Sequence, residues 1–460
     1  MAGGSPDRDR TATALEVMDA LEEQGVRAVI LGFVDPSAIV RVKCVPISRF
    51  PAAADTGVGL STLFNVATSS DGFAELPGYI DGPSGDLRLI ADPDATVPLR
   101  AMPGWAWSQV DQHTQDGEVY AGCPRSFLRR AVEKVSGAGL SVRAAYEFEF
   151  SAGRDLEDGG VEPAHRGPGY SDSALIANHE LALDLITTLE EQGLGMQQFH
   201  PEFTEGQFEI SIAPRDPLAA ADVSIVLRES VRAVARRHGW RTSFSPRTFG
   251  PVGNGVHLHL SLWDGDRNVL AGGNGPEGLT DVGESFVAGI LRELRAIVAI
   301  TCPSPISYLR LQPHHWSGAT QCWGLENREA AIRFIRGMGR TGPDGTNVEV
   351  KPIDGTANPF LALGAILAAG LDGIRKGDRL PPATIEDPSG LPDTERARRG
   401  VRLLPTSLPE AIEELAGSEV LRDAMGEFLF ETFLETRRQE SEHYRDMQEA
   451  DIIRFYRWRY

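Results

Sequence analysis

Apolar and polar residues alternate strictly from Val256 to Leu262, directly after the glycine-rich run 250–255. Successive side chains of a β-strand point to opposite faces, so this pattern predicts a strand with His257, His259 and Ser261 on its polar face. Glycines let the preceding loop adopt conformations and close approaches that a side chain would forbid. Two histidines beside such a loop could meet a metal ion or a phosphate. The alternative is a pair of polar positions on a half-exposed sheet.

Three further alternating segments carry acidic residues on their polar faces. The opposite face of each segment is apolar, as in a sheet that covers a core. Another glutamate, Glu202, stands shortly before the second of these segments. The acidic positions are Glu147 and Glu149 in the strand predicted at 146–150, Glu209 in that at 207–212, and Glu349 in that at 348–351.

Helical spacing of apolar residues dominates the chain after residue 118, where amphipathic helices alternate with the strands. Cys123 and Pro124 open the first of these helices, which ends near Gly137, because proline is favoured at an early helical position. Asn358 and Pro359 give the same kind of start to a long apolar helix. The other ranges are helices at 174–192, 218–237, 281–300, 359–375 and 408–449, loops at 153–169 and 303–323, and an irregular stretch at 376–406.

The first part of the chain has a different pattern, with short strands separated by glycine and proline. We therefore predict a disordered tail at 1–12, a small β-rich domain at 13–118 and a larger domain at 119–460. The small domain has one predicted helix, at 13–23, and paired strands at 28–35 and 40–45, followed from about 50 to 118 by short strand-like runs such as 87–90 and 105–111.

Composition limits the class of protein. The net charge of −20 at pH 7 argues against binding nucleic acid or an anionic membrane, since both need clustered lysine and arginine. Four cysteines without a CxxC pair give no disulfide framework. No apolar run follows Met1 as it does in a signal peptide, and no stretch reaches the length of a membrane span. These features predict a cytoplasmic protein.

The acidic faces would converge if their strands were neighbours in one curved sheet. Carboxylates brought together in this way repel one another unless a cation neutralises them. Oxygen ligands with an imidazole suit Mg²⁺ or Mn²⁺ better than zinc. The five glutamates and one histidine would suffice for two octahedral ions completed by water and phosphate. The alternative is that each polar face simply meets water.

Two divalent ions in a cleft most often bind phosphoryl oxygens. The chain has no Gly-x-x-x-x-Gly-Lys-Ser/Thr loop, and no Gly-x-Gly-x-x-Gly motif follows a predicted strand, so the common nucleotide loops are excluded. Phosphate charge would then be met by metals and by Arg310, Arg328 and Arg333. Taken alone, Arg328 and Arg333 are as well explained by structural ion pairs.

Together these motifs resemble the glutamine synthetase superfamily, type I, over nearly the whole chain. Six segments occur in the family's order with near-family spacing, and so many matches together are highly specific. They are Glu147–Glu149, Glu202–Glu209, Gly253–His259, Tyr308–Leu311, Asn327–Arg333, and Val348–Lys351 running into Ala357–Phe360.

The resemblance implies an α+β fold: a small N-terminal β-grasp domain, then a catalytic domain with a curved antiparallel sheet surrounded by helices. It also implies a homododecamer of two stacked hexameric rings with active sites shared between subunits. The implied metal ligands are Glu149, Glu202 and Glu209 for a first Mg²⁺ or Mn²⁺ ion and Glu147, His257 and Glu349 for a second.

The resemblance assigns the substrates as well. Arg310 would bind the α-carboxylate of glutamate, with the backbone of Gly253 near its amino group; Tyr170 and Lys351 are further candidates for substrate contact. Other implied roles are contact with ATP by His259, Ser261 and Arg333 and catalysis by Arg328, Arg333, Glu202 and Trp316.

The implied reaction activates a carboxylate that otherwise has a poor leaving group. The γ-phosphoryl of ATP passes to the side chain of glutamate, and an amine attacks the resulting γ-glutamyl phosphate. Preorganised charge stabilises the transferring group. The acyl phosphate must also be kept from water, for which the segment 303–323 is the candidate closing loop.

Departures from the family pattern concentrate at the ammonium site. Glutamine synthetases carry Asp-Gly-Ser-Ser where this chain has 64–70, without an aspartate, and a flap glutamate where it has Trp316. Val252 replaces an asparagine, and Asn347 and Lys351 replace arginines. A bulky aromatic in place of an acid suggests an amine that carries carbon.

We therefore expect a γ-glutamyl-amine ligase. The altered pocket is neutral, with Trp316 and Asn65, which favours a small monoamine such as ethanolamine over a polyamine, although acids from unplaced loops would change that preference. Two competing hypotheses are an ammonia-using glutamine synthetase and a non-catalytic binding or scaffold relative. The second of these predicts eroded metal ligands, whereas all six are present.

Overall fold

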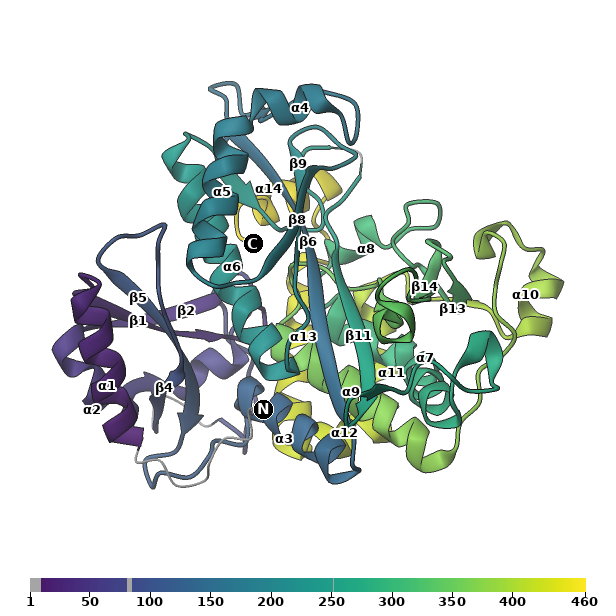
Figure 1. Cartoon of the computed structure of the whole chain (residues 1–460), viewed down its shortest axis with the longest axis horizontal. Coiled ribbons are helices and arrows are strands. Elements are labelled where there is room, and N and C mark those ends of the chain that lie inside the picture. Colours follow the sequence, from purple (N-terminus) through teal and green to yellow (C-terminus); the bar gives the residue numbers. More distant parts are fainter. Residues whose placement is uncertain (1–9, 81–84, 251) are drawn as a thin grey trace.

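The computed structural model describes residues 10–80, 85–250 and 252–460. Its smaller, N-terminal part is a five-stranded mixed sheet in the order β2-β1-β5-β4-β3, with β1 parallel to β5 and the other neighbours antiparallel (Figure 1). Two helices pack on one face of this sheet. The elements are α1 (Arg10–Glu23), β1 (Ala28–Val34), β2 (Val40–Pro46), α2 (Phe50–Asp55), β3 (Val58–Ser61), β4 (Asp86–Pro98) and β5 (Trp105–His113).

The predicted strands of this part are confirmed, although β4 extends to Pro98 and β3 has no predicted counterpart, and two further details are wrong. The tail was expected to reach residue 12, whereas α1 already begins at Arg10; residues 1–9 of that prediction lie outside the described residues. One helix was expected before residue 119, and α2 is a second. The segment 50–55 is too short to show helical periodicity.

The larger part is built on an eleven-stranded sheet. Eight strands follow the order β16-β13-β14-β15-β11-β6-β9-β8, while β10 and β7 pair with β6 and β12 pairs with β11. Figure 1 shows the long strands β6 and β11 side by side at the centre. The strands are β6 (Ser141–Asp155), β7 (Val161–Pro163), β8 (Met196–Pro201), β9 (Gln207–Ile212), β10 (Arg241–Ser243), β11 (Val256–Asp264), β12 (Arg267–Asn268), β13 (Thr320–Leu325), β14 (Ala330–Ile335), β15 (Asn347–Val350) and β16 (Arg402–Leu403).

Helices surround this sheet, as expected for the α+β class. The central pair α7 and α9 approaches closely at Gly289 and Gly373: a Cβ added to Gly373 would lie 2.6 Å from the Cα of Gly289. The helices are α3 (Pro124–Gly137), α4 (Asp172–Ala177), α5 (His179–Glu191), α6 (Pro217–Arg237), α7 (Asp281–Thr301), α8 (Ser307–Arg310), α9 (Pro359–Lys376), α10 (Asp393–Arg399), α11 (Leu408–Ala416), α12 (Glu419–Met425), α13 (Glu427–Tyr444) and α14 (Glu449–Tyr456).

Several predicted boundaries in this part need correction. The sheet is antiparallel except for one parallel pair, β13 with β14. The helix expected at 174–192 is broken at Asn178, whose amide donates to the carbonyl oxygens of Ala164 and Ala174. The expected loops and irregular stretch also contain regular elements: β7 and the end of β6 in 153–169, α8 and part of β13 in 303–323, and α10 and β16 in 376–406.

The two parts are joined by a shared core and by buried hydrogen bonds. Ile30 and Val34 of β1 belong to the main hydrophobic core of the larger part. Asn358, which caps α9, also donates to the backbone oxygens of Val34 and Asp35, at 3.1 Å each. Glu440 of α13 is fully buried and accepts a hydrogen bond from the backbone of Ser69 at 3.0 Å. The predicted boundary at residue 118 falls between β5 and α3.

None of the helices in the described ranges is long and apolar enough to cross a membrane.

Candidate active site

The polar faces of four neighbouring strands meet in one cluster of acidic and imidazole side chains. Strands β15, β11, β6 and β9 lie next to one another in the sheet. Their register places Glu147 opposite His257 and Glu149 opposite Glu209. Glu349 lies opposite His259 in the same way. The alternation seen in the sequence thus brings residues more than 200 positions apart onto one surface, so the convergence expected from the sequence is found in the structure.

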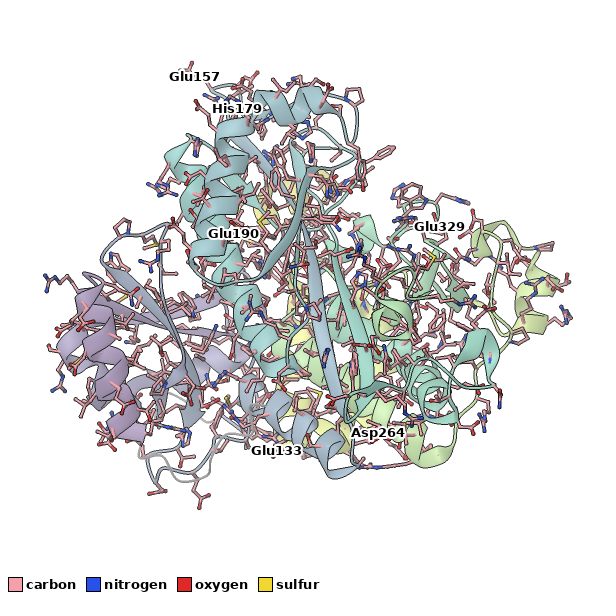
Figure 2. All side chains as sticks on the ribbon, in the orientation of Figure 1. Glu133, Glu157, His179, Glu190, Asp264 and Glu329 are labelled. Atoms are coloured by element: carbon pink, nitrogen blue, oxygen red, sulfur yellow. The ribbon has the colours of Figure 1, made fainter. Side chains whose placement is uncertain are left out.

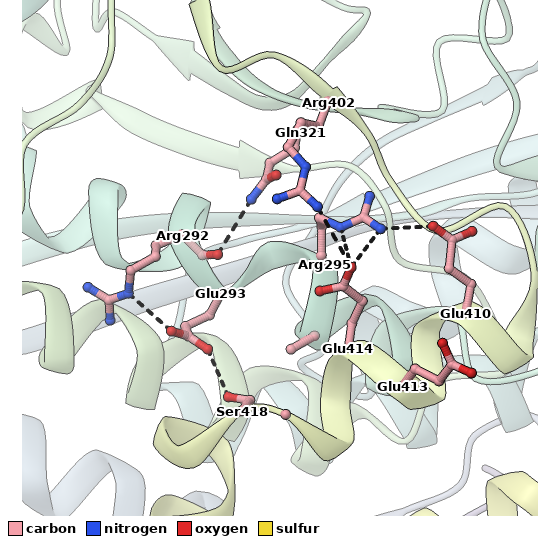
Figure 3. Close-up of a pocket in the computed structure, with 11 residues that line it drawn as sticks. Arg292, Glu293, Arg295, Gln321, Arg402, Glu410, Glu413, Glu414 and Ser418 are labelled. Carbon is pink, nitrogen blue, oxygen red and sulfur yellow. Dashed lines mark hydrogen bonds and ion pairs between the residues drawn. The ribbon is translucent and has the colours of Figure 1, made fainter. Parts of the chain in front are cut away.

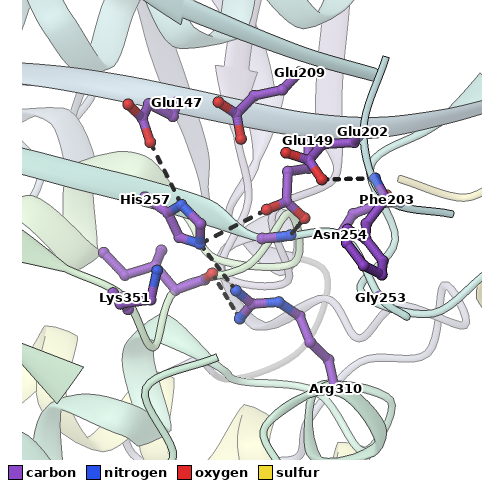
Figure 4. A network of polar contacts seen from close by, with 12 residues as sticks. Glu147, Glu149, Glu202, Phe203, Glu209, Gly253, Asn254, His257, Arg310 and Lys351 are labelled. Carbon is purple, nitrogen blue, oxygen red and sulfur yellow. Dashed lines mark hydrogen bonds and ion pairs between the residues drawn. The ribbon is translucent and has the colours of Figure 1, made fainter. Parts of the chain in front are cut away.

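His257 lies among three carboxylates, and Figure 4 shows two of them, Glu147 and Glu149, beside its ring. Its Nδ1 is 3.6 Å from an oxygen of Glu147 and 3.4 Å from one of Glu349, and its Nε2 is 3.8 Å from Glu149. These separations exceed normal hydrogen-bond lengths. Ligands of one octahedral ion are held about 3 Å apart or slightly more, so the spacing suits atoms grouped around a cation.

Potential ligand atoms form three overlapping groups, each within 4.8 Å. This arrangement fits more than one divalent ion with carboxylate and imidazole ligands, which is the donor set that suits Mg²⁺ or Mn²⁺. The groups are Glu147, His259 and Glu349; Glu147, Glu209 and His257; and His200, Glu202 and Glu209.

His200 was not identified from the sequence. It lies opposite Glu209 in the β8–β9 pair, and its Nε2 is 3.2 Å from Glu202 and 3.7 Å from Glu209. The segment 196–201 has no clear alternation of apolar and polar residues, so it gave no signal of a strand. The only available signal was a histidine two residues before Glu202.

The pKa values of the glutamates in the cluster are shifted in opposite directions. Burial, together with the negative charges of Glu149 and three more glutamates, raises the pKa of Glu209 to about 9. Burial also acts to raise the pKa of Glu349, but the charges of Lys351 and the two histidines outweigh it and lower that pKa to about 2. The histidines likewise lower the pKa of Glu147 against its burial. The side of the cluster at Glu209 therefore lacks neutralising charge, and a bound cation would supply it.

The glycine-rich loop brings its backbone against the cluster. Glu149 accepts hydrogen bonds from the backbone of Gly255 at 2.8 Å and from Gln207 at 3.1 Å. A Cβ at Gly255 would lie 2.2 Å from the guanidinium of Arg310, and one at Gly253 would lie 1.9 Å from the oxygen of Pro246. Only glycine permits this packing, which explains the loop composition.

The cluster lines a cavity of about 480 Å³. All three arginines expected to bind anions face it, together with Gly253 and Lys351. Its further lining residues are Glu147, Glu149, Tyr170, Gln198, His200, Glu202, Phe203, Gln207, Glu209, Val252, His257, His314, His315, Trp316 and Glu349.

The cationic residues of the cavity have different partners. Arg310 is buried, and its guanidinium contacts Nε2 of His257 at 3.3 Å and the oxygen of Ile353 at 3.2 Å. Arg333 and Lys351 both pair with Glu349, at 3.3 Å and 3.1 Å. Arg328 is exposed to the cavity and has no hydrogen bond or ion pair within the described ranges. It is therefore available to an anionic ligand.

His259 and Ser261, both expected near the nucleotide, differ in their distance from the acidic cluster. His259 is next to the cluster, with Nε2 3.4 Å from Glu147 and Nδ1 2.9 Å from the side chain of Asn347. Ser261 does not line the cavity; its hydroxyl accepts a hydrogen bond from the indole of Trp263 at 2.8 Å. The segment 64–70 also lies elsewhere, where Ser69 contacts Glu440 of α13.

Another cavity, of about 450 Å³, lies between α7 and α11 (Figure 3). One arginine neutralises two of its acids: Arg295 pairs with Glu410 at 2.8 Å and with Glu414 at 2.7 Å. Glu293 accepts a hydrogen bond from Ser418 at 2.8 Å. This cavity offers no group of metal-binding side chains in the described part of the chain, so it does not compete with the first as the active site.

Comparisons with known proteins agree with this geometry. Residues 121–456 match the family described as glutamine synthetase, catalytic domain. Gamma-glutamylpolyamine synthetase GlnA3 of Streptomyces coelicolor is 42% identical over 461 residues, covering 100% of this chain and 98% of the relative. Glutamine synthetase of Mycobacterium tuberculosis strain H37Rv is 32% identical and covers 93% of this chain and 95% of the relative.

Solved structures give the same result. A crystal structure of a novel glutamine synthase homologue has a TM-score of 0.84 and 34% identity, covering 95% of this chain and 99% of that chain. A GmaS complex with ADP has a TM-score of 0.81 and 27% identity, and the match covers 95% of this chain and 98% of that chain. The chain belongs to the glutamine synthetase family, whose members are carbon–nitrogen ligases that use ATP and divalent metal ions.

Divalent ions are expected to stabilise the folded protein through this cluster. A ligand that binds only the native state at 100 times its dissociation constant adds about 2.7 kcal/mol. Adding Mg²⁺ or Mn²⁺ to protein treated with EDTA should therefore raise the thermal unfolding temperature. Equal unfolding temperatures with and without these ions, at concentrations up to several millimolar, would contradict the assignment of a metal site.

Proposed function

We propose that this protein uses ATP to join the γ-carboxylate of glutamate to an organic primary amine. The observation that carries the proposal is Trp316 at the cavity, in the place of the flap glutamate of glutamine synthetases. Its side chain is 53% exposed, and its backbone has a positive φ of 52°. Strained residues of this kind are concentrated at functional sites. An exposed indole offers a surface for the body and the charge of an organic cation.

The proposed roles of the polar residues in and beside the cavity rest on the family resemblance, and the positions of these residues are compatible with them. Arg310 and the backbone of Gly253 bind glutamate, with Tyr170 and Lys351 near it. Arg328 and Arg333 stabilise the phosphoryl group during transfer, and His259 contacts the phosphates of ATP. Bound divalent ions would supply charge neutralisation for that transfer. The proposed ligands are Glu149, Glu202 and Glu209 for one ion and Glu147, His257 and Glu349 for the other.

Within the class of organic amines, we propose a polyamine before ethanolamine. The 42% identical relative bears the name of a polyamine ligase. Two acids also lie beside the rim, one in the segment 327–333 and one in the stretch 376–406. Glu329, labelled in Figure 2, accepts a hydrogen bond from the backbone of Trp316 at 3.2 Å, and Asp387 contacts His314 at 2.9 Å. Such carboxylates suit a second ammonium group, which ethanolamine lacks.

The proposal is tested by phosphate release with ATP and glutamate held fixed and the amine varied. We expect putrescine and spermidine to support turnover better than ethanolamine, and ethanolamine better than ammonium. If ammonium proved the best acceptor, the protein would instead be an ordinary glutamine synthetase. If ethanolamine exceeded the polyamines, the preference for a polyamine would be wrong while the proposed amine ligase would stand.

Replacing Trp316 by glutamate is expected to shift the selectivity toward ammonium. The change removes the aromatic surface for carbon and supplies a carboxylate at the place where glutamine synthetases carry one. We expect the ratio of kcat/KM for ammonium to that for putrescine to rise about tenfold, the effect of roughly 1.4 kcal/mol in binding. Trp316→Phe, which keeps an aromatic ring, is the matched control. An unchanged ratio in Trp316→Glu would show that this residue does not set the selectivity.

The oligomeric state is proposed from the family resemblance. We propose two stacked hexameric rings, and light scattering of the purified protein would distinguish twelve subunits from a smaller assembly.

A further inference from the structure

Phe203 lies at the rim of the cavity, directly after the proposed metal ligand Glu202. Its backbone amide donates to the carboxylate of Glu202 at 2.6 Å, so the backbone of Phe203 is fixed to the acidic cluster. Its side chain, in contrast, is 61% exposed. The residue thus joins the cluster at its backbone and presents an apolar ring to the cavity.

The ring of Phe203 meets Trp316. The two ring centroids are 6.3 Å apart in an edge-to-face arrangement. Phe203 comes from the β8–β9 connection and Trp316 from the segment between α8 and β13. Both side chains line the cavity, and both are more than half exposed. Two segments far apart in the sequence therefore build one apolar corner above a charged floor.

Neither ring is placed there by core packing. Phe203 and Trp316 are absent from the hydrophobic clusters of the described residues. Keeping such large rings in water has a free-energy cost that burial by a ligand would recover. Glu329, through its hydrogen bond to the backbone of Trp316, helps to keep that residue in its left-handed conformation at the corner. A hydrogen bond outside the hydrophobic core thus helps to fix Trp316 beside the cavity.

We infer that Phe203 and Trp316 form the amine subsite and that Phe203 sets selectivity for the length of the amine's carbon chain. The inference rests on the proposed function. The methylene groups of the amine lie against the two rings, while its attacking nitrogen points toward the floor of the cavity. That nitrogen forms a bond to the carbon of the acyl phosphate, phosphate leaves with the electrons of the broken carbon–oxygen bond, and the surplus proton passes to solvent.

The experiment measures KM and kcat for a homologous series: ethylamine, propylamine, butylamine, 1,3-diaminopropane and putrescine. A fully buried methylene strengthens binding about fourfold, and a half-exposed corner should give about twofold per methylene. We expect this dependence on chain length in the unaltered protein and its loss in Phe203→Ala. For putrescine, kcat/KM should fall about tenfold in that variant, while the KM values for ATP and glutamate stay within about twofold.

Two further variants separate selectivity from general damage. Phe203→Leu keeps part of the apolar area and should retain part of the dependence on chain length. Leu183→Ala removes a side chain of α5 that is 64% exposed and does not line the cavity, so it should leave every kinetic constant unchanged.

The role of Phe203 and the proposed function can be contradicted by different results. A dependence on chain length that is equal in Phe203→Ala and the unaltered protein would overturn the role of Phe203 and leave the proposed function standing. If the unaltered protein used ammonium but none of the organic amines, the proposed function would be wrong, and this inference would be wrong with it.

Discussion

Replacing Glu209 by glutamine is expected to reduce ATP-dependent phosphate release about a thousandfold, and at the same time to stabilise the metal-free protein. Glu209 is buried beside Glu149 and close to three more glutamates, which raises its pKa to about 9, so without a cation it must take up a proton when the protein folds at neutral pH. Glutamine keeps the shape of the side chain and is neutral in both the folded and the unfolded chain, so it avoids the cost of that proton uptake. A bound metal ion contributes several kcal/mol to stabilising the charge of the transition state, and each 1.4 kcal/mol is about tenfold in rate, so weaker binding of that ion should slow the reaction strongly.

Turnover is followed as phosphate release, and stability is measured separately as the thermal unfolding temperature. In EDTA, Glu209→Gln should unfold a few degrees above the unaltered protein, and added Mg²⁺ or Mn²⁺ should raise its unfolding temperature less. Glu205→Gln is the matched control, because Glu205 lies four residues away and pairs with the exposed Arg166 at 2.9 Å. If Glu209→Gln kept the turnover of the unaltered protein, the proposed ligand set would be wrong.

Replacing Arg328 by glutamine is expected to lower kcat about a thousandfold without changing stability. An arginine that stabilises a transferring phosphoryl group contributes about 10³-fold or more to the rate. Arg328 lines the cavity and has no ion pair or hydrogen bond in the described ranges, so its removal leaves no buried charge unpaired. The free energy of unfolding should therefore stay within about 0.5 kcal/mol of the unaltered value.

A control for Arg328→Gln is Arg236→Gln, which changes an exposed arginine in the last turn of α6, away from the cavity. Activity is followed as phosphate release at saturating ATP, glutamate and amine, and stability by denaturant unfolding. A loss of activity accompanied by an equal loss of stability would point to a structural role for Arg328. Unchanged activity would remove Arg328 from the phosphoryl site.

The sequence predicts best the strands that have one apolar face on the hydrophobic core and one polar face on the cavity. Val256–Leu262 and 146–150 show this pattern, and both lie in the central strands β11 and β6. Their register could not be read in advance. Alternation assigns His257 and Glu147 to polar faces, but only strand pairing places the two residues opposite each other.

The missed features have physical reasons as well. Strand β8 exposes neighbouring residues without alternation, which hid His200. At the break, the side chain of Asn178 donates to the oxygen of Ala164, a partner outside the helix that no local pattern contains. Lys351 and Arg333 carry charges that suit a substrate, yet in this structure both neutralise Glu349. Sequence motifs identify such groups, whereas their partners depend on the tertiary structure.

The joint between the two parts of the chain limits how the enzyme can move. Val34 is buried in the main core, and the amide of Asn358 fastens the end of β1 to the start of α9. A swing of the N-terminal part would have to break both. The two parts of the chain should therefore move as one body, and the cavity keeps a fixed place relative to the N-terminal sheet.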